Sequence, residues 1–221
     1  MMLAAATASA AAVTLNALNS GFYNPAGTLT NGNYAIGWYT GNGGAELRDF
    51  FVFDLSTVTG TITGATLRLA SKGPSTSGFL TSDPSETITL FDVSTGVAAL
   101  IGGTGGSAAY NDLGTGTAYG SLVVTSAMAS QTFYDIPMNA AGLTALQNSL
   151  GANQFAVGGT LTSLTRGATN EAMFNGTNGT LTRQLIITTT DSVNAVPEPA
   201  SVLLTASGML GALVLRLRRS R

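Results

Sequence analysis

The feature that most constrains the fold is a succession of short strand-like segments separated by glycine, asparagine, serine and proline. In Thr61–Ala70 (TITGATLRLA), apolar and polar side chains alternate from Ala65 onward, as in a strand with one buried face. In Arg48–Leu55 the run Phe50–Phe53 is continuously apolar, which favours a strand buried on both faces at the centre of a sandwich. Segments of this kind are typical of antiparallel sheets.

The rest of the chain up to Thr189 fits the same class. One helix is expected at Ala140–Leu150, where Asn139 offers an N-cap and Gly151 a stop, while the glycine-rich Ala99–Thr117 is expected to be a long loop. About nine strands, one short helix and no strand–helix alternation predict an all-β fold, an antiparallel β-sandwich of jelly-roll type. The further expected strands are Tyr34–Tyr39, Thr87–Val93, Ser121–Thr125, Thr132–Pro137, Gln154–Gly158, Glu171–Phe174 and Thr182–Thr189.

Composition excludes several mechanisms. The chain has no cysteine and no histidine, so it cannot form disulfides or use a thiolate or a histidine base. Of its 9 basic residues, four lie from Arg216 onward, whereas only one of its 11 acidic residues follows Ala195. The body is therefore net negative, which argues against a nucleic-acid partner.

Three groupings are candidates for catalysis. Lys72 lies near several serines, but such proximity is expected by chance in a serine-rich loop. A glycosidase needs two carboxylates across the scissile bond, and Asp49 and Asp54 face opposite sides of one strand, about 17 Å apart. Asp83 and Glu86 flank a proline turn, as solvated turn residues often do. The sequence therefore predicts no catalytic residues and no enzyme.

Cofactor and ligand sites are only weakly indicated. No acidic spacing matches a calcium loop, so no metal or other cofactor is predicted, although a structural Ca²⁺ held by loop carbonyls with one or two acidic side chains stays open. Tyr34 and Trp38 would share one face of a strand and could stack on a sugar ring; packing of Trp38 in the core is the competing interpretation. The acidic candidates for Ca²⁺ are Glu46, Asp49, Asp83 and Glu86.

The N-terminus resembles an export signal in part. Residues 1–12 are alanine-rich and apolar, and Ala8-Ser9-Ala10 is suited to signal-peptide cleavage, but no lysine or arginine precedes Arg48. A disordered alanine-rich start is the alternative. We expect a signal-peptide remnant at 1–12, a sandwich ectodomain at 13–190 and a linker at 191–195.

The last residues, 196–221, combine three signals. Val196–Pro199 reads Val-Pro-Glu-Pro, where the prolines Pro197 and Pro199 hold Glu198 on an extended segment. The uncharged run Ala200–Leu215 would span roughly 24 Å as a helix, marginal for a bilayer core of about 30 Å. Closing arginines would keep the C-terminus in the cytoplasm and the body outside. These arginines are Arg216, Arg218, Arg219 and Arg221.

This tail resembles the PEP-CTERM sorting signal of bacterial surface proteins. The resemblance implies recognition by an exosortase, a membrane enzyme that would cut near Val196–Pro199, with the chain as its substrate. It also implies transient membrane anchoring, followed by residence at the cell surface or in the extracellular matrix. The alternative is an ordinary C-terminal membrane anchor that is never removed.

A second, looser resemblance covers Arg48–Leu69, which is similar to paired strands of secreted carbohydrate-binding-like sandwiches carrying the same tail. We therefore expect an exported, non-enzymatic structural or adhesive sandwich. The alternative is a carbohydrate-binding module with exopolysaccharide as its partner, and the exposure of Trp38 distinguishes the two.

Overall fold

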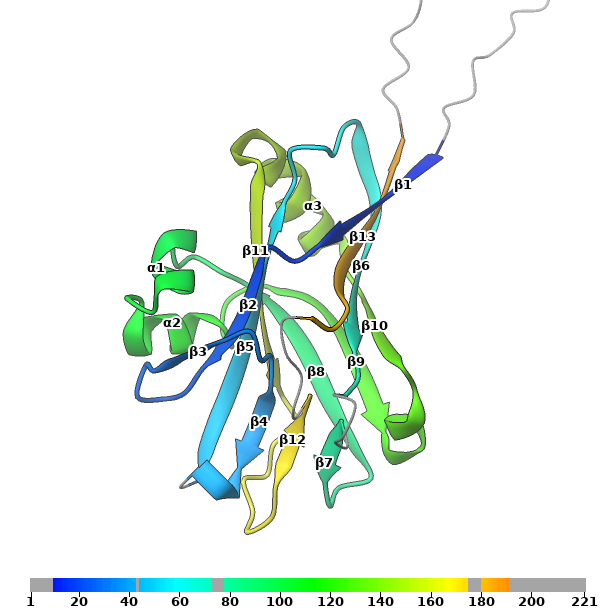
Figure 1. The fold of residues 1–221 in the computed structure, drawn as a ribbon. Helices are drawn as coiled ribbons and strands as arrows, with labels where there is room; N and C mark the ends of the chain where they lie inside the picture. The colour runs from blue at the N-terminus through cyan, green and yellow to red at the C-terminus, as the bar shows by residue number, and fades with distance from the viewer. Residues whose placement is uncertain (1–9, 43, 73–77, 175–179, 191–221) are drawn as a thin grey trace, which may run out of the picture. The chain divides into compact units, whose positions relative to one another are not determined.

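The computed structural model describes residues 10–42, 44–72, 78–174 and 180–190, and these residues belong to one compact unit. Two antiparallel sheets lie on either side of a shared hydrophobic core, so the prediction of an all-β sandwich is confirmed (Figure 1). None of the helices in these ranges is long and apolar enough to cross a membrane. The expected transmembrane helix at 200–215 lies outside the described residues and stays a prediction.

The smaller sheet has four strands and brings the two ends of the described chain together. Its strands lie in the order β1-β13-β6-β10, and Ala10 at the start of β1 is paired with Thr190 at the end of β13. The chain therefore enters and leaves this unit at the same end of the sheet. The bounds are β1 Ala10–Asn16, β13 Arg183–Thr190, β6 Thr61–Ala70 and β10 Phe133–Pro137.

The larger sheet has nine strands and follows the order β7-β12-β4-β5-β11-β8-β9. β2 pairs with residues 48–52 in the middle of β5, and β3 pairs with β2. The bounds are β2 Asn19–Tyr23, β3 Leu29–Asn31, β4 Ile36–Tyr39, β5 Ala45–Asp54, β7 Phe79–Thr81, β8 Ser85–Asp92, β9 Ala118–Thr125, β11 Gln154–Leu161 and β12 Glu171–Met173.

β5 occupies the centre of this sheet, as its continuously apolar run predicts. Phe51 and Phe53 point into the core between the sheets. Phe50 and Val52, on the other face, belong to a second hydrophobic cluster on the outside of the sheet. Both faces of β5 are buried because residues 97–113 cover the second cluster on the outside of the sheet.

That cover consists of two helices, and here the prediction of a loop at Ala99–Thr117 is wrong. α1 (Val97–Gly102) and α2 (Gly106–Asp112) lie beside β2 and β3 (Figure 1). The hydroxyl of Tyr23 donates a hydrogen bond to the carbonyl oxygen of Leu100 at 2.6 Å. Burial of apolar side chains against the sheet outweighs the low helix propensity of glycine. The buried residues of this segment are Leu100, Ala109, Tyr110 and Leu113.

The predicted helix at Ala140–Leu150 is confirmed as α3 (Ala140–Ser149). The side chain of Asn139 accepts a hydrogen bond from the N–H of Gly142 at 3.0 Å, which is the expected cap. Instead of stopping at Gly151, the chain makes a 3-10 turn at Leu150–Ala152 and ends it at Asn153 in the left-handed conformation. Two further 3-10 turns lie at Thr40–Asn42 and Ser126–Ser130.

The described ranges contain thirteen strands where nine were expected, because four short or irregular strands lack a readable alternation: β1, β2, β3 and β7. β1 matters most, since its first residues Ala10–Ala12 fall in the segment assigned to the signal peptide. They pair with Thr188–Thr190 of β13 instead. An alanine run has no periodicity, so only the neighbouring strand reveals its conformation.

Candidate functional site

The proposed ligand platform does not form, because Tyr34 lies in the core. Tyr34 is 0 % exposed, and its hydroxyl donates a hydrogen bond to the carbonyl oxygen of Ala70 at 3.0 Å. Its ring packs against Phe51 and Phe174, with centroids 5.4 and 5.3 Å away. A side chain enclosed in this way cannot stack on a sugar.

Trp38 is half-buried and is placed among charged residues. In the register of the larger sheet, it lies opposite Glu46 of β5 and Glu171 of β12. Its indole packs against Gly44, where a Cβ would come within 2.8 Å of Trp38 Cζ2. The indole nitrogen is buried and has no hydrogen-bond partner among the described residues. The Trp38 ring therefore packs partly against the protein. With Tyr34 in the core, the two residues do not form the exposed aromatic face expected of a sugar-binding module.

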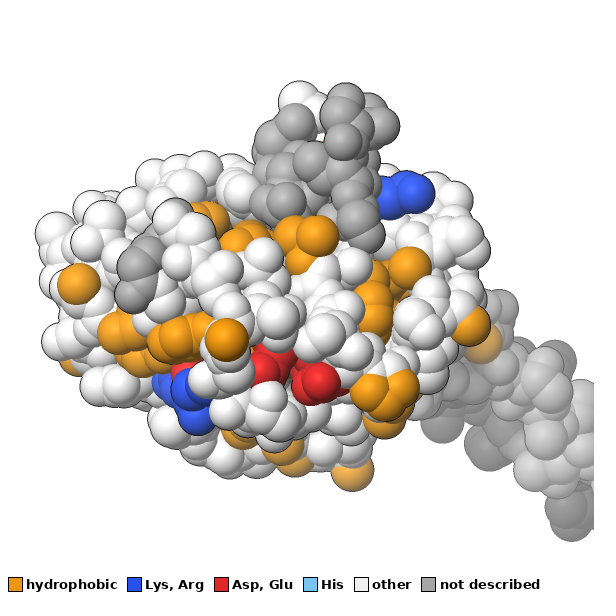
Figure 2. Space-filling model, turned by 90° about the horizontal axis from the view of Figure 1, so that it is seen from below, with side chains coloured by type: hydrophobic (Ala, Val, Ile, Leu, Met, Phe, Trp, Pro, Cys, Tyr) orange, Lys and Arg blue, Asp and Glu red, His pale blue; other side chains and the backbone are white. Residues whose placement is uncertain are grey.

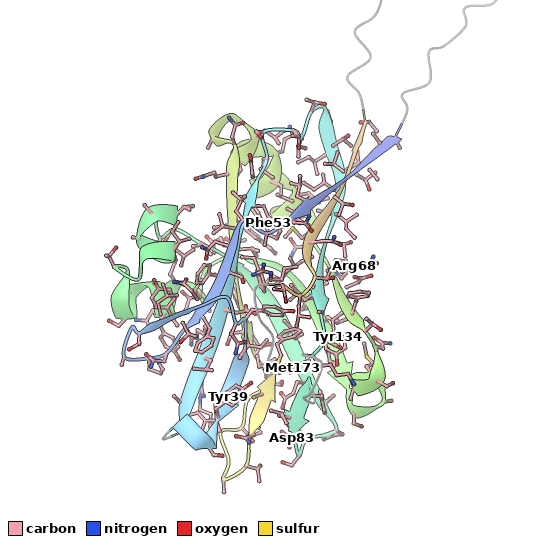
Figure 3. All side chains as sticks on the ribbon, viewed as in Figure 1. Tyr39, Phe53, Arg68, Asp83, Tyr134 and Met173 are labelled. Atoms are coloured by element: carbon pink, nitrogen blue, oxygen red, sulfur yellow. The ribbon has the colours of Figure 1, made fainter. Side chains whose placement is uncertain are left out.

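The main polar feature of the sandwich is instead a loop held by three buried carboxylates. Residues 162–170, here called the 162–170 loop, connect β11 to β12 at the end of the sheet where Asp83 lies (Figure 3). Figure 2 shows acidic and basic side chains gathered at this end of the molecule. The carboxylates of Glu46, Glu86 and Glu171 each contact this loop.

Glu86 and Glu171 bind the loop through hydroxyl and backbone donors. Glu86 accepts hydrogen bonds from the hydroxyls of Thr81 (2.8 Å) and Ser163. Glu171 accepts from the N–H and hydroxyl of Thr165, each at 2.5 Å, and from the N–H of Gly167 at 3.0 Å. Burial alone would raise the pKa of Glu171, but these donors hold that pKa below its ordinary value.

Glu46 holds the loop through charge. Its carboxylate accepts from Arg166 Nη2 at 2.6 Å, from Arg48 Nε at 2.9 Å and from the hydroxyl of Thr160 at 3.3 Å. The Arg48 guanidinium also lies 4.3 Å from the ring centroid of Tyr110 on α2. Burial would raise the pKa of Glu46, yet the two arginines lower it overall. The pair Glu46–Arg48 thereby connects the 162–170 loop to the helices that cover β5.

The fold also brings together an acidic cluster that sequence analysis found only in part. Carboxylate oxygens of Asp83, Glu86 and Glu171 lie within 4.8 Å of one another. Asp83 and Glu86 were singled out as neighbours in the chain, whereas Glu171 joins them only because β7 pairs with β12. Of the other Ca²⁺ candidates, Glu46 is paired with arginines, and Asp49 has no place in this cluster.

Protein donors already engage the two buried acids of this cluster. Ca²⁺ takes six to eight oxygen ligands. The oxygens of Glu86 and Glu171 already accept hydrogen bonds from Thr81, Ser163 and Thr165. Glu86 is 0 % and Glu171 2 % exposed, so the two acids are also closed to a polymeric glycan, which a hydrolase would have to place between them. Their evident role is to hold the loop.

Comparisons with other proteins add nothing to this geometry. No family model and no curated protein matches the chain. Function therefore has to be inferred from the residues of this chain.

Asp49, on β5 of the larger sheet, is a buried acidic residue separate from the acidic cluster. It is 2 % exposed and lies opposite Gly159 of β11, where a Cβ would contact its carboxylate. Burial raises the pKa of Asp49 well above its ordinary value of 3.8. Tyr34 is close enough for the charge of Asp49 to help raise the pKa of the Tyr34 hydroxyl, which burial raises most. Ionised Asp49 therefore destabilises the folded state.

We expect Asp49→Asn to stabilise the protein at neutral pH. Because the folded-state pKa of Asp49 is raised, the contribution of Asp49 to stability is most favourable below about pH 4 and becomes less favourable as the pH rises toward that pKa. The amide does not titrate, so the stability advantage of Asp49→Asn over wild type should grow as the pH rises from 4 to 7. Urea unfolding at pH 4 and pH 7 measures this difference.

The exposed Asp54 provides the control. Its carboxylate accepts a hydrogen bond from the N–H of Ser56 at 2.8 Å, and this bond lowers its pKa. Asp54→Asn should therefore give no gain at neutral pH. Equal pH profiles for wild type and Asp49→Asn would show that Asp49 is solvated rather than buried.

Proposed function

We propose that the chain is an exported, non-enzymatic surface or extracellular-matrix protein, delivered by its C-terminal signal and processed by an exosortase-type membrane enzyme. The support is the order of three elements at the chain end: Val196–Pro199, the apolar run Ala200–Leu215 and the arginines from Arg216. The apolar run would form a transmembrane helix that holds the protein transiently, and the sandwich, of jelly-roll type in this proposal, would be the product.

The observation that carries the proposal is where the folded unit ends. β13 is paired along its length with β1 on one edge and β6 on the other, and it ends at Thr190. The Pro-Glu-Pro triplet begins seven residues later, at Pro197. A cut there would leave every described strand in place. The body therefore has the autonomy that a processed cargo requires.

The body suits a structural or adhesive role. Only 9 % of the residues are charged, and the buried acids Glu46, Glu86 and Glu171 hold a loop. The alternative is a module that binds exopolysaccharide. It is less favoured because Tyr34 is buried, which leaves only the half-buried Trp38 of the two platform residues. We therefore place the structural role first.

Intact mass spectrometry of the protein from the envelope and medium of its native host tests the sorting proposal. We expect a product ending near Val196–Pro199 in cells with the sorting enzyme, and a chain ending at Arg221 in cells that lack the enzyme. The same spectrum reports the N-terminus, which cleavage after Ala10 would leave at Ala11.

A Pro197→Ala, Pro199→Ala double variant is the matched control, because it keeps the apolar run and the arginines. It should stay unprocessed and remain in the membrane fraction. If wild type retains Arg221 in both strains, the sorting proposal fails and the tail is a plain membrane anchor.

A further inference from the structure

We propose that the free edge of β1 is a self-association site, which pairs antiparallel with β1 of a second copy and joins the two smaller sheets into one. β1 is the outer strand of its sheet, with β13 on one side only. It is seven residues long (AAAVTLN) and contains no charged residue and no proline. Strands with these properties pair readily with other chains. This inference goes beyond the proposed function, since it does not depend on export.

The other long sheet edges in the described parts of the chain are guarded. β10 ends at Pro137 and carries Asp135 in an ion pair with Arg68 at 2.7 Å. At β9, Asn139 covers the start of the edge, its side chain donating to the Ala118 carbonyl at 2.8 Å and its N–H to the Tyr119 carbonyl at 2.7 Å. β3 and β7 have only three residues each. β1 stands out because nothing in the described structure protects it.

The hydrogen bonds around β1 indicate which groups are available. The N–H of Ala17, just after β1, donates to the carbonyl of Arg183, so odd-numbered residues of this segment face β13. The N–H and C=O groups of the even-numbered residues therefore point to the free edge. These residues are Ala10, Ala12, Thr14 and Asn16.

One two-fold register uses all of these groups. With Val13 opposite Val13 of the second copy, Ala12 pairs with Thr14 and Ala10 with Asn16, and every such pair is hydrogen-bonded. No like charges meet, because the strand has none. Val13 and Leu15 are only partly buried against the core, and β1 of the second copy would bury more of their apolar surface. The Ala12–Thr14 pairs persist if processing removes Ala10.

A second copy fits this edge better than the chain's own ends. The 31 residues after Thr190 continue from β13, whose two edges are already taken by β1 and β6. For residues 1–9 to cover the edge, the chain would have to reverse just before Ala10, and residues 5–9 (AATAS) contain none of the Gly or Asn-Gly residues that hairpin turns favour. We therefore commit to a second copy, with coverage by residues 1–9 as an outcome of the test.

The absence of cysteine makes a cross-linking test direct. In the proposed register the two Val13 Cβ atoms form a non-hydrogen-bonded pair about 4.5–5.5 Å apart, close to the reach of a disulfide. We expect the full-length Val13→Cys chain, purified in detergent and mildly oxidised, to form a disulfide-linked dimer. Val123→Cys on β9, which is 55 % exposed, is the control and should remain monomeric.

Thr14→Pro separates the edge from the fold. Its N–H points to the free edge, so proline blocks pairing with a second copy but spares the bonds to β13. Adding Thr14→Pro to Val13→Cys should abolish the cross-linked dimer with no loss of thermal stability, whereas Thr14→Val should retain it. A monomeric Val13→Cys overturns the proposal. If deleting residues 1–9 then produces the dimer, the chain's own N-terminus covers the edge. Because unprocessed protein is used, the result is independent of sorting.

Discussion

Replacing Phe174 with alanine is expected to lower the free energy of unfolding by about 4 kcal/mol. Phe174 follows β12 and is fully buried. Its ring lies 5.3 Å from that of Tyr34 and 5.9 Å from that of Tyr134, centroid to centroid. Tyr134 belongs to β10 of the smaller sheet, so Phe174 joins the aromatic packing of both sheets. Its removal opens a cavity that neither sheet can close without moving.

Phe174→Leu and Tyr134→Phe are the matched controls. Leucine keeps most of the volume and should cost roughly half as much as alanine. Tyr134→Phe loses only the hydrogen bond to the Met128 carbonyl (3.3 Å), worth about 1 kcal/mol. Each of the three variants has an L-residue with a Cβ at position 174, so the positive φ of 63° found there disfavours all of them alike. A Phe174→Ala protein that unfolds at the wild-type urea concentration would contradict this account of the core.

The second large effect is expected at Glu46. Removing one partner of a buried ion pair leaves the other charge without compensation, and we expect Glu46→Ala to cost about 3 kcal/mol at pH 7. The side chains of Glu46 and Arg48 are only 6 % and 15 % exposed. Because the pKa of Glu46 is lowered in the fold, its contribution is present above the ordinary value of 4.5 and is lost as the pH falls. Urea unfolding at pH 7 and pH 3 measures both statements.

The arginines distinguish the buried pair from the loop contact. Arg166 is 53 % exposed, so Arg166→Ala should cost far less than Glu46→Ala, while releasing the 162–170 loop to proteases. Glu46→Gln keeps the shape but not the charge and should fall between them. If Glu46→Ala and Arg166→Ala prove equally mild, the Glu46–Arg48 pair is solvated and contributes little.

Much of the sandwich is predictable because its signals are local. The ten-residue strand β6 was predicted with its bounds, since one buried face imposes alternation on the sequence. Phe50–Phe53 predicted a central strand, and α3 was predicted from the N-cap at Asn139. α1 and α2 were missed because their glycine content favours a loop, and the apolar surface of β5 that stabilises them is distant in sequence.

The candidate site shows the same limit more sharply. Asp83 and Glu86 could be read as neighbours, but Glu171 reaches them only through the pairing of β12 with β7. Tyr34 and Trp38 share a predicted strand, and nothing in that strand distinguishes a core ring from an exposed one. Whether Asp49 would be solvated or buried depends in the same way on β11, which pairs with β5 and places Gly159 opposite Asp49.

By itself, then, the sequence determined the β class, the central place of Phe50–Phe53, the absence of histidine and cysteine chemistry, and the three-part tail from Val196 that motivates the sorting proposal. Only the tertiary structure decided that Tyr34 is core, that Glu46, Glu86 and Glu171 hold one loop, and that β1 ends its sheet with an open edge. The physical reason is range. Periodicity and caps act over a few residues, whereas burial and strand pairing depend on segments that meet only when the chain is folded.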